Sequence, residues 1–179
     1  MNRIFLTLST LSNLCLAWAF WLGWSIDDPR SPSIQAQAAV TWHLLVAVFL
    51  AGVIVLLAHA VALTYFMGTG RWIEEICEAY SLGPAARQEN IRLKYRALPG
   101  MVLSVLLLLA TGAFGAISDP AANFQMTSAP TIHFALATVT LIGNILASWV
   151  EYAGIAHNGR IVKEVLAEVM RIRAERGLS

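Results

Sequence analysis

The sequence predicts an all-α integral membrane protein, built as a four-helix bundle with helical extensions on the cytoplasmic side. Its composition supports this prediction, because 58% of the 179 residues are hydrophobic, only 13% are charged, and the mean hydropathy is +0.64. The chain also contains four runs free of Asp, Glu, Lys and Arg, each longer than the roughly 20 apolar residues that cross a bilayer. These runs are Ile4–Ile26, Ser31–Gly70, Ala97–Ser118 and Ala121–Val150.

Within these runs we expect four transmembrane helices, in one membrane domain that covers residues 1–179. Their expected bounds are about 4–26, 38–68, 97–118 and 130–156. The first run also has features of a signal peptide, because Arg3 precedes it and Ala17-Trp18-Ala19 is similar to a cleavage site. We interpret this run as a retained span.

The positively charged residues indicate the orientation of the spans. Lys and Arg concentrate in segments 71–96 and 160–179, and Arg3 precedes the first span, whereas the loop after the first span has only Arg30. Both termini are therefore expected in the cytoplasm, in a multi-pass protein of a bacterial-type inner membrane surrounded by lipid. Since topology explains the basic residues, they do not indicate a nucleic-acid partner.

The two cytoplasmic segments, 71–96 and 160–179, are expected to extend the second and fourth spans as amphipathic helices. In the second of them, apolar residues recur at helical spacing from Ile161 to Ile172, beside a charged face. Such a face packs on a membrane surface or on a partner.

The two halves of the chain share three motifs in the same order, which indicates an internal repeat of two helices. "GWSIDDP" from Gly23 and "GAISDP" from Gly115 end the first and third spans. "TWHLL" and "TIHFA" open the second and fourth spans, and "GRWIEEICEA" and "GRIVKEVLAE" follow them. Helix ends commonly carry Asp, Pro and Gly, but this tendency does not explain why a histidine opens both even-numbered spans.

All four histidines lie in or near the second and fourth spans, and an ionisable residue inside a span is a candidate functional residue. The repeat places His43 and His133 at the same outer level, and His157 is expected to be exposed near the cytoplasmic end of its helix. His59 follows His43 by sixteen residues, which is about 24 Å along a helix. At about 100° per residue His43 and His59 face nearly opposite sides, so a role as a second metal ligand is a secondary hypothesis for His59. Its simplest expected role is a buried hydrogen bond to the first or third span.

His43 and His133 are the predicted ligands of a haem b. Two imidazoles at equal depth on facing helices can bind a haem iron axially, with the flat ring between the helices. Gly52 and Gly143 hold matching places in the two repeats and would let the ring or a neighbouring helix approach closely. The alternative is a zinc or copper site completed by nearby acids. These acids are Asp27, Asp28 and Asp119.

A line of polar residues follows one face of the fourth span. Asn144 and Glu151 lie eleven and eighteen residues after His133, close to the same angle. The matching line on the second span runs from His43 to Tyr65. These groups are suited to a proton path, to a quinone head group, or to hydrogen bonds between helices. Glu151 has the alternative of pairing with a basic residue, and the candidates are Arg71 and Arg160.

From the second span onward, the chain resembles the small membrane haem proteins of the HemJ-type protoporphyrinogen oxidase and CopD-like copper-transport kind. The features that carry the resemblance are His43 followed by Gly52, the segment "YRALPGMVLSVLLLLATG" from Tyr95, and His133 at the start of the next span. The resemblance implies that His43 and His133 bind haem. The HemJ-type proteins have a Lys shortly after the second His, whereas "HFALAT" has none, so their oxidase activity is not expected here. Four-helix membrane cytochromes b are similar in architecture.

Together these observations predict a membrane haem b protein that transfers electrons or anchors a redox partner. An electron-transfer or accessory subunit fits the sequence better than a stand-alone enzyme, and the expected partners are other membrane or periplasmic redox subunits. Two alternatives stay open: a cofactor-free structural subunit of a larger membrane complex, and a small metal transporter.

Overall fold

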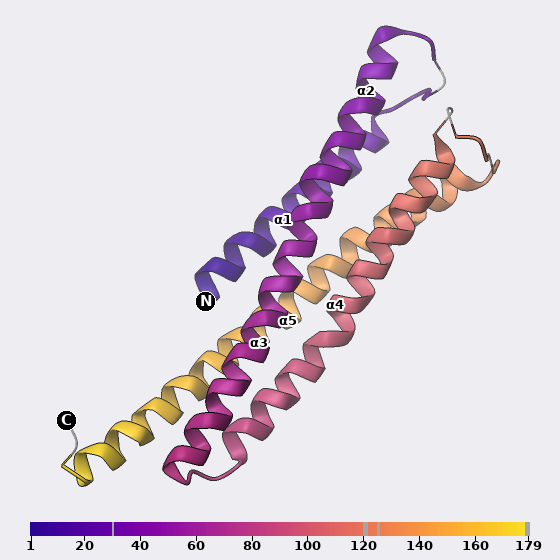
Figure 1. Cartoon of the computed structure of the whole chain (residues 1–179). Helices are drawn as coiled ribbons and strands as arrows, with labels where there is room; N and C mark the ends of the chain where they lie inside the picture. Colours follow the sequence, from indigo (N-terminus) through magenta and orange to yellow (C-terminus); the bar gives the residue numbers. More distant parts are fainter. Residues whose placement is uncertain (30, 120–121, 125, 178–179) are drawn as a thin grey trace.

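The computed structural model describes residues 1–29, 31–119, 122–124 and 126–177, and every regular element in these residues is helical. The second span is one continuous helical stretch of three parts, α2, η1 and α3, whereas each other span is a single helix (Figure 1). The elements are α1 (Asn2–Trp24), α2 (Ile34–Leu44), η1 (Leu45–Gly52), α3 (Val53–Tyr80), α4 (Ala85–Ser118) and α5 (Ala129–Glu175).

Four helical stretches are long and apolar enough to cross a membrane. This confirms the prediction of an all-α chain with four helices that could span a membrane. They are α1, the continuous stretch Ile34–Tyr80, α4 and α5. The helices continue beyond the predicted spans. α5 runs to Glu175 and α4 already begins at Ala85, so most of the two charged segments is helical.

The ends of the second span have local causes. The Ser33 hydroxyl accepts a hydrogen bond from the Ala36 backbone N–H at 3.2 Å, which caps the start of α2. α3 ends at Tyr80, and the next residue, Ser81, has a left-handed φ of 55°. Gly83 and Pro84 follow two residues later. The chain then turns back into α4 (Figure 1).

The π-helix η1 changes the direction in which side chains of the second span point. A π-helix repeats its hydrogen bonds at i→i+5, so each residue turns through a smaller angle than in an α-helix. The total rotation over eight π-helical residues is therefore smaller than over eight α-helical residues, by roughly a third of a turn. Gly52 ends this segment. A Cβ atom on Gly52 would lie 3.3 Å from the carbonyl oxygen of Ala47, five residues earlier.

α5 packs against α1, α3 and α4. Its most extensive contact is with α4, which lies beside α5 (Figure 1). Two apolar cores hold the helices together. The core at the end nearer to the α3–α4 turn contains Phe5, Phe66 and Ile155, all fully buried. The core at the other end contains Cys15, Ala51 and Val55 from α1, η1 and α3. Because Phe5 and Cys15 both belong to α1, the first helix is part of both cores.

Candidate functional site

The structure brings together the two histidines that the repeat pairs. The ring centroids of His43, on α2, and His133, on α5, lie 6.1 Å apart, and the ring planes meet at 82°. Both side chains are half-buried. They come from helices separated by ninety residues of chain, so the contact between them depends on how the two halves pack.

Each of these histidines is held by a backbone carbonyl of the preceding helix. His43 Nδ1 lies 3.0 Å from the Ala19 carbonyl oxygen, and His133 Nδ1 lies 2.9 Å from that of Thr111. A carbonyl only accepts, so Nδ1 carries the hydrogen and Nε2 has the lone pair of the neutral ring. Among the described residues, neither Nε2 has a hydrogen-bond partner. A hydrogen bond of this kind at Nδ1 is what orients a metal-binding imidazole.

A glycine stands four residues after each accepting carbonyl, which places it directly above that carbonyl on the helix. A Cβ atom on Gly23 would lie 2.8 Å from Cε1 of His43, and one on Gly115 would lie 3.0 Å from Cε1 of His133. Glycine therefore makes room for each ring to reach its carbonyl. The two halves of the chain repeat this arrangement, which supports the internal repeat.

Gly23 and Gly115 mark the repeat in the sequence, but the close approach of a ring or a neighbouring helix was predicted at Gly52 and Gly143. A Cβ on Gly143 would lie 3.3 Å from Leu107 of α4, so this glycine does allow close helix packing. The Cβ position of Gly52 is close only to the backbone of its own helix, at the Ala47 carbonyl oxygen. Neither has a histidine atom within 4 Å of its Cβ position. The signal for the correct pair was already in the sequence, since both glycines open the shared motif at the end of the odd-numbered spans.

Nothing in the described residues supports the predicted alternative of a zinc or copper site completed by acids. No group of three or more His, Cys, Asp or Glu side chains in the described part of the chain is arranged to hold a metal ion. Asp27, Asp28 and Asp119 therefore do not join His43 and His133 in such a group.

Aromatic side chains surround the outer end of the helices. Phe134, next to His133, packs against Phe20 and Trp24 of α1, with ring centroids 5.3 and 5.2 Å apart. Trp18, Trp21, Trp24 and Trp42 are all at least half exposed. Exposed tryptophans at the end of an apolar helix are typical of a membrane interface.

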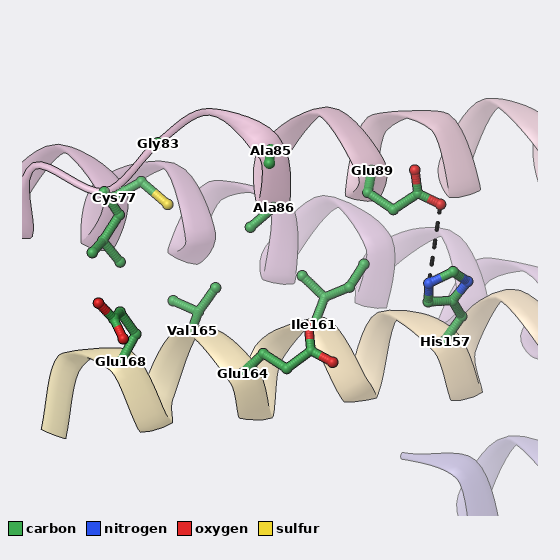
Figure 2. Close-up of a pocket in the computed structure, with 11 residues that line it drawn as sticks. Cys77, Gly83, Ala85, Ala86, Glu89, His157, Ile161, Glu164, Val165 and Glu168 are labelled. Atoms are coloured by element: carbon green, nitrogen blue, oxygen red, sulfur yellow. Dashed lines mark ion pairs between the residues drawn. The ribbon is translucent and has the colours of Figure 1, made fainter. Parts of the chain in front are cut away.

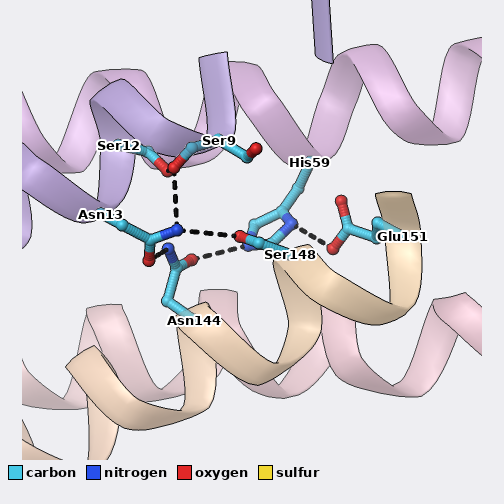
Figure 3. A network of polar contacts seen from close by, with 7 residues as sticks. All are labelled: Ser9, Ser12, Asn13, His59, Asn144, Ser148 and Glu151. Carbon is cyan, nitrogen blue, oxygen red and sulfur yellow. Dashed lines mark hydrogen bonds and ion pairs between the residues drawn. The ribbon is translucent and has the colours of Figure 1, made fainter. Parts of the chain in front are cut away.

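His59 is the centre of a second, buried polar network (Figure 3). Its Nδ1 lies 2.7 Å from Oε1 of Glu151, and its Nε2 lies 3.1 Å from Oδ1 of Asn144. Asn144 donates to Asn13 of α1 at 2.8 Å, and Asn13 donates to the Ser9 carbonyl and to the Ser148 hydroxyl. Both ring nitrogens of His59 are therefore engaged by protein oxygens, and neither is available to a metal ion.

Two predictions for His59 are corrected by these contacts. Its side-chain partners are on α5, in the fourth span, rather than on the first or third span. The prediction that His43 and His59 face opposite sides is also wrong, since both contact side chains of α5, His133 in one case and Asn144 and Glu151 in the other. The cause is η1, which lies between the two histidines and reduces the rotation that a regular α-helix would give.

The polar line predicted on the fourth span is confirmed. His133, Asn144 and Glu151 all contact side chains of the second span. Glu151 pairs with His59, not with the predicted Arg71, which binds Glu75 at 2.9 Å. Tyr65, the end of the predicted matching line on the second span, has its ring against Phe66, with centroids 5.8 Å apart, and its hydroxyl near Gly159 of α5.

A third polar cluster lies nearer to the α3–α4 turn. Asn90 donates to Oδ1 of Asn158 at 2.8 Å, and Asn158 donates to the Thr69 hydroxyl at 2.7 Å. Both asparagines are buried. They link α3, α4 and α5 where these helices leave the apolar spans.

A shallow groove between the α3–α4 turn and α5 lies beyond this cluster (Figure 2). It is lined partly by acids, among them Glu89, Glu164 and Glu168. A hydrogen bond from Arg171 lowers the pKa of Glu168. His157 lies 4.0 Å from Glu89 and is half-buried within α5. It was predicted as an exposed residue near a helix end, but α5 continues well beyond it.

Comparisons with known proteins leave the geometry as the only guide to function. No protein-family model matches the chain, and no curated protein or solved structure is significantly similar to it.

Proposed function

We propose that the chain is a membrane haem b protein that transfers electrons, and that His43 and His133 would hold the haem iron. The observation that supports this most directly is the equivalent binding of the two imidazoles. Each Nδ1 donates to a backbone carbonyl, each Nε2 keeps its lone pair, and the rings lie 6.1 Å apart.

The separation of the rings fits two ligands of one metal. An imidazole nitrogen binds a metal ion at about 2 Å, so two rings on opposite sides of an iron have centroids about 6 Å apart. Haem iron needs only two protein ligands, whereas a structural zinc ion needs four. A pair of histidines without a third or fourth ligand residue nearby therefore fits haem better than a bare metal ion.

Each part of the chain around the pair has a definite role in this proposal. His43 and His133 bind the iron, and the carbonyls of Ala19 and Thr111 orient their rings. Phe134, beside His133, packs with Phe20 and Trp24 and makes that end of α1 and α5 apolar. When bound, the haem supplies one-electron oxidation and reduction.

The proposal includes the setting of the protein. We place the four apolar helices across a bacterial-type inner membrane as a four-helix bundle with both termini in the cytoplasm. The many exposed Leu, Val, Ile and Trp side chains along the helices support this placement, because such surfaces are unfavourable in water. The histidine pair then lies toward the outer side, where a periplasmic or membrane redox partner would exchange electrons with it.

The test is the visible absorption spectrum of the full-length protein, purified from membranes in mild detergent without added cofactor. We expect a Soret band and split α and β bands after reduction with dithionite. His43→Ala and His133→Ala should each abolish this low-spin spectrum, whereas His157→Ala, the matched control on α5, should keep it.

The absence of haem bands from wild-type protein would refute the proposal. In that case elemental analysis separates the two alternatives. A stoichiometric transition metal would indicate a metal transporter, and no bound metal would indicate a structural subunit.

A further inference from the structure

We propose that His59 and Glu151 form a proton-binding site inside the spans, and that Oε2 of Glu151 is the atom that takes up the proton. The inference goes beyond haem binding and does not depend on it, because the two sites share no residue. It follows from the direction of each hydrogen bond in the network and from one buried oxygen without a partner (Figure 3).

The direction of the hydrogen bonds is set by a backbone carbonyl. The Ser9 carbonyl can only accept, so the atom of Asn13 that faces it at 2.8 Å is the amide nitrogen. Oδ1 of Asn13 then accepts from the amide nitrogen of Asn144, and Oδ1 of Asn144 faces Nε2 of His59. Nε2 of His59 must therefore carry a hydrogen.

The remaining ring nitrogen shares one proton with Glu151. Nδ1 of His59 and Oε1 of Glu151 are 2.7 Å apart, and one of the two atoms must donate. The proton belongs either to an imidazolium beside a carboxylate or to a neutral carboxylic acid beside a neutral imidazole. In both cases the pair is neutral overall, and among the described residues every buried side-chain nitrogen and oxygen but one has a hydrogen-bond partner.

The exception is Oε2 of Glu151. Glu151 is fully buried, and Oε2 has no hydrogen-bond partner among the described residues. A buried carboxylate that serves only to hold helices together normally has both oxygens satisfied. Leaving one oxygen of a charged carboxylate unpaired is costly, and a proton at Oε2 removes the charge of that carboxylate.

No other titratable group competes for this proton. α1 contributes Ser9, Ser12 and Asn13 to the network, and α5 contributes Asn144 and Ser148 (Figure 3). None of these side chains titrates. Among the described residues, α4 adds no side chain to the network, and His59 is the titratable group that contacts Glu151.

The exchange itself is simple. A hydronium ion delivers a proton, which forms an O–H bond at Oε2, and a water molecule leaves. The pair then consists of an imidazolium beside a neutral carboxylic acid. Release of the proton to water reverses the step, and no electron moves.

The experiment is infrared difference spectroscopy of the full-length protein as it is titrated between about pH 4 and about pH 10. We expect a carbonyl band of a buried carboxylic acid that grows as the pH falls. The band should be absent from Glu151→Gln and unchanged in Glu164→Gln, which removes an exposed carboxylate from the same helix. If the spectra of wild type and Glu151→Gln change identically with pH, Glu151 keeps one protonation state and the proposal is overturned.

A second measurement needs no variant at Glu151. In wild-type protein labelled with ¹⁵N-histidine, we expect both ring nitrogens of His59 to be protonated throughout the pH range in which the infrared band grows, because the incoming proton binds Glu151 and not the ring. The signal is assigned by its loss in His59→Gln. An unprotonated Nε2, or an Nδ1 that gains its proton as the pH falls through this range, would contradict the proposed site whether or not the protein binds haem.

Discussion

The most informative perturbation is to add one methyl group beside each outer histidine, in Gly23→Ala and Gly115→Ala. The new Cβ would lie 2.8 Å from His43 in the first case and 3.0 Å from His133 in the second. Both distances are shorter than a carbon–carbon contact of about 3.5 Å. Each ring must therefore leave its carbonyl acceptor on the preceding helix.

The expected change in stability is small because two effects oppose each other. Alanine is more favourable than glycine inside a helix by about 1 kcal/mol. The lost hydrogen bond from Nδ1 contributes about 1 kcal/mol. Since the two rings are half-buried, they can turn toward the surface, and the carbonyls keep their partners within the helix. The net change in the free energy of unfolding should be within about 1 kcal/mol of zero.

The effect on the ligands should be large by comparison. A ring that loses its acceptor is no longer oriented by that hydrogen bond, so haem occupancy should fall at least about tenfold. Gly112→Ala is the matched control for α4, since its Cβ would meet nothing within 4 Å. This control should gain about 1 kcal/mol of stability and keep the wild-type absorption spectrum.

The assay combines thermal unfolding in detergent with haem content per protein. The imidazole ¹⁵N spectrum adds a measurement of the Nδ1 hydrogen bond that does not require haem. If Gly23→Ala and Gly115→Ala keep both the haem and the Nδ1 hydrogen bonds of the Gly112→Ala control, the glycines do not create the site and the reasoning is refuted.

Three further predictions concern the helix contacts. Gly154→Ala should destabilise the protein by about 1–3 kcal/mol in thermal unfolding, because the Cβ would lie 3.0 Å from the fully buried Phe66; unchanged stability would contradict this. Asn158→Leu should cost about 1–3 kcal/mol in the same assay, since it leaves Asn90 without its partner at 2.8 Å. Deleting Phe49, an exposed residue of η1, should rotate the part of the second span that carries His43 by about 100° and abolish haem binding. The control Phe49→Ala should retain haem binding. Haem binding by the deletion variant would show that η1 does not set the direction of His43.

The apolar helices and the polar face of the fourth span could be predicted from the sequence, because both depend on regular spacing. Long charge-free runs fix where a helix can cross a membrane. Residues 133, 144 and 151 return to one face under a constant rotation of about 100° per residue, and α5 is α-helical through all of them. The pairing of His43 with His133 followed from the repeat, which compares equivalent positions and needs no assumption about rotation.

The contacts of His59 could not be predicted in the same way. Its predicted direction assumed that the rotation stays constant from His43 onward, and η1 breaks that assumption in the middle of an apolar run. "LVAVFLAG" has nothing in its apolar pattern that separates a π-helix from an α-helix. Gly52 is the one visible feature, and a glycine inside an apolar helix is commonly read as a point of close packing.

The π-helix has a consequence for how the protein would work. A regular α-helix would direct only one of the two second-span histidines toward α5. With η1 between them, both face α5 but in different chemical states: His43 keeps a free Nε2 next to a second imidazole, whereas both nitrogens of His59 are engaged. One pair of helices thus carries a site suited to a metal and a site suited to a proton. Since they share a helix but no residue, a variant of one should leave the other intact, and this independence allows each proposal to be tested alone.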